Sequence, residues 1–141
     1  MAFLFDTDAI SELLRLRPAV AYIDWLKQVP REEQFTNSVV IGELYKGAYR
    51  SPNRDRHLIN IEQRVLPAVT VLPYDLSAAK IFGRVRALLE ETGTILPDAD
   101  IQIAATALAY DLELITGNLD HFRRISGLKL NTILEQVKRS N

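Results

Sequence analysis

Short apolar segments alternate with helical segments along the sequence, and this alternation constrains the fold more than any other feature. Apolar runs bounded by turn residues predict buried strands, and five are expected, over residues 2–5, 34–36, 69–72, 113–116 and 128–130. Apolar residues at helical spacing predict the helices between them, through residues 6–16, 18–26 with Pro18 in the first turn, 39–49, 58–65, 75–91 and 98–110. The alternation predicts an α/β fold: a three-layer α/β/α sandwich around a mostly parallel central sheet.

The length, net charge and composition of the sequence narrow the class of protein. Its 141 residues fit a single domain over residues 1–141, and a net charge of −1 means that any nucleic-acid binding must come from a local basic patch. The sequence contains no cysteine, so any bound metal must take oxygen or imidazole ligands. No apolar run reaches the ~20 residues of a membrane span, and no signal peptide is recognisable at the start. We therefore expect a cytoplasmic protein without a membrane partner.

Three acidic residues interrupt segments that otherwise belong in the core. Asp6 closes the first predicted strand, Glu43 lies in an apolar helix, and Asp100 lies in the first turn of an alanine-rich helix. A buried carboxylate needs a partner, and ligands of a parallel α/β sheet gather beyond the carboxyl ends of its strands. Carboxylates that converge without enough basic partners favour a hard divalent cation, Mg²⁺ or Mn²⁺.

Each of these positions also has a purely structural interpretation. Asp6 would cap the first helix, and Glu43 would face a solvent-lined edge. Asp98 follows a proline and fits a helix cap better than a metal ligand, which leaves Asp100 in a first turn where the helix dipole favours a carboxylate. Residues 116–120 would form a plain turn. The metal hypothesis therefore depends on the set of acids and not on any one of them.

Four segments together resemble the PIN-domain family, in particular the VapC and FitB type of toxin from toxin–antitoxin pairs. The resemblance covers nearly the whole chain and lies in residues 4–12, 37–44, 93–95 with 100–107, and 115–122 with 125–128. The first segment runs from an apolar strand into Asp-Thr, with Asp8 where the family more often has asparagine. The third places Asp100 three residues before Ile-Ala-Ala, which selects Asp100 over Asp98 as the ligand.

The resemblance implies a Mg²⁺- or Mn²⁺-dependent endoribonuclease that hydrolyses RNA with a metal-activated water. By position, Asp6, Glu43 and Asp100 would bind the metal, and Thr7 and Thr116 would support them by hydrogen bonds. The resemblance also implies an antitoxin partner that blocks the acidic groove, and a homodimer.

The fourth acidic position of the family's site is ambiguous in this sequence. Asn118 stands at the aligned place, and Asp120 follows two residues later. Either side chain would complete the catalytic site, and both remain candidates.

Basic residues near the predicted site are candidates for RNA contacts, because lysine and arginine neutralise phosphates. These candidates lie one and two turns after Glu43 and on the helix before the third motif, namely Lys46, Arg50, Arg84 and Arg86. An ordinary solvated face explains any one of them equally well. Weaker candidates are Arg54, Arg56 and His57. Neither His57 nor His121 has a partner at metal-ligand spacing, so both are expected to be non-ligands.

Two other functions remain open at the level of sequence. Asp6-Thr7-Asp8 after an apolar strand also fits a phosphohydrolase of the haloacid-dehalogenase type, in which Asp6 would be the nucleophile. The second alternative is a binding module, either a signalling receiver domain with Asp75 as its only phosphoacceptor candidate or a catalytically silent PIN-like module.

Overall fold

The computed structural model describes the backbone of residues 1–140 and the side chains of residues 1–137; the predicted domain boundary at residue 141 lies outside the described residues. Its sheet has five strands, in the order β3-β2-β1-β4-β5. The strands are β1 (Phe3–Phe5), β2 (Gln34–Asn37), β3 (Thr70–Leu72), β4 (Glu113–Ile115) and β5 (Leu130–Asn131). Every pairing is parallel, which confirms the predicted sheet.

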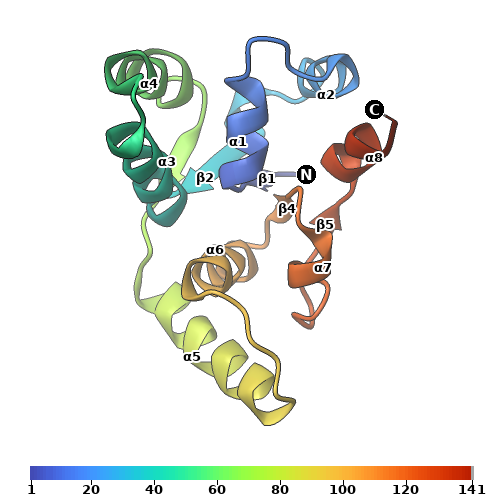
Figure 1. The fold of residues 1–141 in the computed structure, drawn as a ribbon. Helices are drawn as coiled ribbons and strands as arrows, with labels where there is room; N and C mark the ends of the chain where they lie inside the picture. Colours follow the sequence, from blue (N-terminus) through green and yellow to red (C-terminus); the bar gives the residue numbers. More distant parts are fainter. Residues whose placement is uncertain (141) are drawn as a thin grey trace.

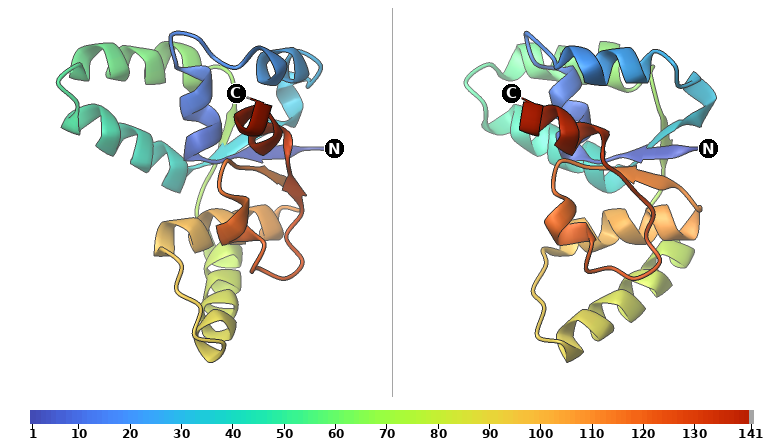
Figure 2. Two further views of the ribbon diagram at one scale, coloured as in Figure 1. Left: turned by 45° about the vertical axis from the view of Figure 1, so that its right-hand side comes forward. Right: turned by 90° about the vertical axis from the view of Figure 1, so that its right-hand side faces the viewer.

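Helices connect consecutive strands and cover both faces of the sheet. They are α1 (Thr7–Leu13), α2 (Val20–Leu26), η1 (Arg31–Glu33), α3 (Ser38–Arg50), α4 (Arg54–Asn60), η2 (Ile61–Val65), α5 (Leu76–Glu91), α6 (Asp98–Ala109), α7 (Leu119–Phe122) and α8 (Ile133–Ser140). In Figure 1, α5, α6 and α7 lie on one side of the sheet, and α1 to α4 and α8 lie on the other. The turned views keep this separation (Figure 2), so the predicted three-layer sandwich is confirmed.

The core lies on both faces of the central strands. All three residues of β1 are buried, with Leu4 fully inaccessible. The alanine-rich α6 is buried nearly all round, because small side chains allow it to pack closely against the sheet and against α5. The apolar spacing of α5 predicts that Leu88 faces inward, but Leu88 is 52% exposed, because it lies at the flank of the face that buries Val85 and Leu89.

Several boundaries differ from the sequence prediction. Pro18 precedes α2, whose first residue is Val20, and the last strand begins at Leu130, two residues later than predicted. The fourth helix continues from α4 into η2, a five-residue π-helix that the periodicity did not reveal. Within the described part of the chain, no helix is both long and apolar enough to cross a membrane.

Candidate active site

The order of the strands creates a crevice beside β1. From β1 the chain goes to β2 and β3 on one side, and later to β4 and β5 on the other. Such a reversal of direction is the place where open parallel sheets bind ligands, beyond the carboxyl ends of the strands. Asp6 and Thr116 follow directly after β1 and β4, so they flank this crevice.

Asp6 is a buried carboxylate without a cationic partner among the described residues. It caps α1 by accepting a hydrogen bond from the Ala9 amide at 2.8 Å, as its structural interpretation predicts. Burial raises the pKa of Asp6 to about 7, repulsion from Asp8 and Asp100 adds to the rise, and hydrogen bonds from the Thr116 hydroxyl and the Ala9 amide oppose it. Asp6 is 5% exposed. The crevice therefore holds a carboxylate whose charge is poorly compensated.

Asp100 lies near Asp6, in the first turn of α6. Its Oδ2 is 3.0 Å from Nδ1 of His121, and the same ring nitrogen is 2.9 Å from the Asn118 amide nitrogen. Nδ1 of His121 carries at most one proton. If Nδ1 donates that proton to Asp100, it cannot also accept from the Asn118 side-chain NH₂ group, so Asn118 must then turn its side-chain oxygen toward the ring. The contact between His121 and the acidic crevice was missed by the sequence prediction.

Glu43 is positioned by the start of α3. Asn37, at the end of β2, caps this helix by accepting from the Val40 amide at 2.9 Å. The Asn37 amide also donates to Thr106 on α6 at 3.0 Å. Six residues after Asn37, Glu43 accepts a hydrogen bond from the Thr7 hydroxyl at 2.5 Å. The structure therefore places Glu43 next to the residue that follows Asp6.

Two other acids of the sequence prediction lie away from the crevice. Asp98 was expected to cap α6, but the capping position is Pro97, which has no side-chain acceptor; Asp98 is the first helical residue, and its exposed carboxylate pairs with Arg86. The Asp120 side chain is 89% exposed and pairs with Arg123 at 3.2 Å. Of the two residues proposed for the fourth position, only Asn118 joins the network around Asp100.

Asp6, Glu43 and Asp100 offer the oxygen ligands that a divalent cation requires, although they are not gathered into a complete metal site. Among the residues that the structure describes, no three acidic or imidazole side chains lie close enough together to hold an ion as they stand. Carboxylate oxygens nevertheless suit Mg²⁺ and Mn²⁺, and neither Asp6 nor Glu43 has an ion pair with a described residue. The donor set therefore fits a hard cation.

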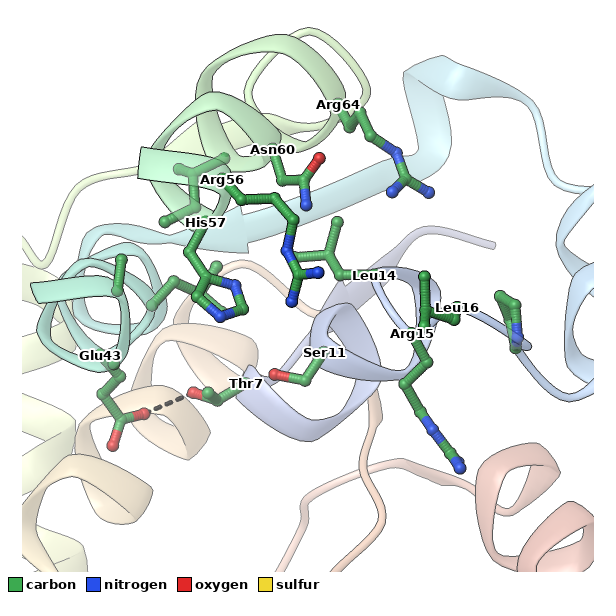
Figure 3. A pocket seen from close by; sticks show the side chains of 15 residues that line it. Thr7, Ser11, Leu14, Arg15, Leu16, Glu43, Arg56, His57, Asn60 and Arg64 are labelled. Atoms are coloured by element: carbon green, nitrogen blue, oxygen red, sulfur yellow. Dashed lines mark hydrogen bonds between the residues drawn. The ribbon is translucent and has the colours of Figure 1, made fainter. Parts of the chain in front are cut away.

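A cavity of about 800 Å³ extends from Glu43 and Thr7 along α1 toward α4 and η2. Arg56, His57 and Asn60 of α4 project into this space (Figure 3). The basic residues that the sequence favoured are elsewhere: the side chain of Arg86 is bound to Asp98, and the cavity lining does not include the other three, Lys46, Arg50 and Arg84.

The two rival site assignments lack structural support. A haloacid-dehalogenase site would need the second acid beside Asp6, but Asp8 is exposed on α1. Asp75 caps α5 after the edge strand β3 and accepts a hydrogen bond from Tyr110, whereas a receiver domain carries its phosphoacceptor on a central strand.

Comparison with known proteins agrees with this geometry. Residues 3–128 match the model of the PIN domain. The VapC ribonuclease Y4jK of Sinorhizobium fredii is 32% identical over 124 residues, which are 84% of this chain and 89% of that protein.

Solved structures give the same result. FitAcB from Neisseria gonorrhoeae superimposes with a TM-score of 0.84 at 26% identity, over 93% of this chain and 97% of the other. A toxin–antitoxin complex from Klebsiella pneumoniae superimposes with a TM-score of 0.68 at 25% identity, over 94% and 98% of the two chains. The chain therefore belongs to the PIN-domain family.

Proposed function

We propose that this protein is a divalent-metal-dependent endoribonuclease and the toxin of a toxin–antitoxin pair. The observation that carries the proposal is the buried, uncompensated carboxylate of Asp6 at the crevice of the sheet, with Asp100 near enough to raise its pKa. A carboxylate in this position is unfavourable unless a cation neutralises it. The likeness to a relative named a ribonuclease supports RNA as the substrate.

In this proposal Asp6, Glu43 and Asp100 hold the cation, which is Mg²⁺ or Mn²⁺. Such an ion lowers the pKa of a bound water and neutralises charge on a phosphodiester. Because the three carboxylates are not gathered in advance, the proposal assigns their final convergence to the binding of the ion.

The residues around the acids orient them. The Thr7 hydroxyl donates to one oxygen of Glu43, and the Thr116 hydroxyl donates to Asp6 while accepting from the backbone N–H of Asn118 at 2.9 Å. His121 holds Asp100 from the side of α7. Hydrogen-bonded partners of this kind set ligand orientation, and their loss commonly lowers metal affinity or activity by about 10–100-fold.

The partners follow from the same relatives. A toxin–antitoxin complex is among the structural matches, so we propose an antitoxin as the physiological partner of this chain. A homodimer is a further prediction. On α3, Tyr45 and Tyr49 stack with ring centroids 6.4 Å apart, and Tyr49 is 55% exposed. We therefore propose this helix as the site of a subunit contact.

The decisive experiment compares Asp100→Ala with Asp98→Ala. Both acids lie in the first turn of α6, but Asp98 faces Arg86 at the surface, so it is a matched control. Cleavage of single-stranded RNA is measured with Mn²⁺, with Mg²⁺ and with EDTA, and Mn²⁺ binding is measured by calorimetry. We expect Asp100→Ala to lose cleavage and to bind Mn²⁺ more weakly, and Asp98→Ala to retain both.

Two results would overturn the proposal in different ways. If the wild type binds Mn²⁺ but leaves every RNA intact, the protein is the silent binding module. If Asp100→Ala cleaves as well as Asp98→Ala, the assignment of the metal ligands is wrong.

A further inference from the structure

We propose that the polar face of α4 and η2 binds the phosphate backbone of single-stranded RNA and leads the strand to the acids. This inference rests on the proposed nuclease function and adds a substrate path to it. The surface is defined here as the α4 groove: Arg56, His57, Asn60 and Arg64 on one wall, and Thr7 and Ser11 of α1 on the other.

The spacing of the residues places the polar groups in one row. Arg56, Asn60 and Arg64 are four residues apart, so they recur on one face and rise by about 6 Å at each step of an α-helix. That step is comparable to the separation of neighbouring phosphates along an extended strand. The last step passes through the π-helical turn η2, and such turns occur frequently at functional sites.

The polar groups of this row have few partners within the protein. The side chains of Arg56, His57 and Asn60 make no hydrogen bond or ion pair with any residue that the structure describes, although His57 and Asn60 are half-buried. Arg64 uses one guanidinium nitrogen to donate to the Leu13 carbonyl at 3.1 Å, and its other guanidinium donors have no partner in the part of the chain that the structure describes. Figure 3 shows Arg56, His57 and Asn60 pointing toward α1.

The basic side chains along the α4 groove favour a phosphate chain as its occupant, although the cavity is also lined by apolar side chains such as Leu14, Leu44 and Ile61. Its wall carries Arg56 and Arg64, whereas the acid Glu43 stands at the end beside Thr7. Arg15 also borders the cavity, but it is paired with Glu12 at 3.0 Å and points away from the row (Figure 3). A strand laid along the row would have its backbone neutralised by arginines and would reach the acids at the end of the groove.

The test measures RNA binding separately from cleavage. An end-labelled oligouridine, which forms no stable pairs, is titrated by fluorescence anisotropy in EDTA in an Asp100→Asn background, across a range of salt concentrations. The variants are Arg56→Gln and Arg64→Gln, and the matched control is Lys80→Gln, an exposed cation of α5 in the opposite layer. The Arg56 side chain has no hydrogen bond or ion pair with a described residue, so its replacement should leave the fold intact.

Each lost phosphate contact should reduce the slope of log K against log salt by about 0.7, which is roughly fivefold in Kd at ~0.1 M salt relative to 1 M. We expect this change for Arg56→Gln and for Arg64→Gln, and none for Lys80→Gln. Unchanged Kd and slope in both arginine variants would overturn the inference while leaving the nuclease proposal intact.

Further outcomes separate the two proposals. If the wild type never cleaves RNA but the arginine variants still bind it more weakly, the nuclease proposal fails and the RNA path stands. An oligoglutamate peptide serves as an acidic protein probe. If Arg56→Gln loses the peptide but keeps RNA, the groove is a protein-docking site and the inference is wrong.

Discussion

Replacing Asp6 by asparagine should stabilise the metal-free protein, and the gain should grow as the pH rises. Burial raises the pKa of Asp6 from its ordinary value of 3.8 to about 7. A carboxyl group with a raised pKa in the folded state contributes stability fully below the unfolded pKa, and that stability is lost as the pH rises through the folded pKa. Asparagine keeps the shape and the oxygen that accepts from Ala9, but it never ionises.

The size of the effect follows from the two pKa values. Their gap corresponds to roughly 4 kcal/mol at 1.36 kcal/mol per pKa unit. Integrated over pH, the advantage of Asp6→Asn over the wild type should be about 2 kcal/mol at pH 5 and about 4 kcal/mol at pH 8. The growth of about 2–3 kcal/mol between the two pH values is the robust quantity, because constant effects of the substitution cancel.

The assay is urea unfolding in EDTA at several pH values, with Asp8→Asn as control. Asp8 is the neighbouring acid of α1 and is exposed, so its replacement should change stability by about 0.5 kcal/mol or less. Added Mn²⁺ should offset most of the advantage of Asp6→Asn, because a ligand that binds only the folded wild type adds about 2.7 kcal/mol at 100 times Kd. A difference between Asp6→Asn and wild type that does not vary with pH would refute the reasoning.

Three further predictions concern the surroundings of the acids. Thr7→Val removes the hydroxyl that Glu43 accepts and should lower both stability, by about 1 kcal/mol, and Mn²⁺ affinity, by about tenfold in calorimetry. Asn37→Ala removes the cap of α3 and should cost about 2 kcal/mol in urea unfolding, whereas Asn53→Ala, which removes no side-chain cap of α4, should have little effect. Asp120→Ala should retain wild-type cleavage rates, because that exposed side chain points into solvent; a large loss would return it to the site.

The sheet and most helices could be predicted because their signals are local. A three-residue buried strand such as β1 is apolar at every position, and β1 ends where Asp6 begins. The π-helical turn η2 could not be predicted in this way, because its apolar residues Ile61 and Val65 are four apart, as in an ordinary helix. Its extra width depends on the hydrogen bond from the Leu66 amide to the Ile61 carbonyl.

The site was predicted only in part, because its members are joined by packing. His121 and Asp100 are 21 positions apart, and they meet because the buried side chains of Leu119 and Phe122 fix α7 against α6. The only sequence signal was a histidine between an aspartate and a buried phenylalanine. In the same way, sequence spacing does not distinguish Arg56 from an ordinary solvated arginine. Only the fold shows that Arg56 faces α1 across the cavity.

The position of β1 has a consequence for the synthesis of the protein. The first strand made is the central strand of the sheet, and its partner β4 begins more than a hundred residues later. At about 5–20 residues per second, one edge of β1 waits on the order of ten seconds for its neighbour to leave the ribosome. Asp6 and Asp100 therefore come together only after most of the chain has been translated. Until then the growing polypeptide lacks the complete set of acidic residues at the crevice.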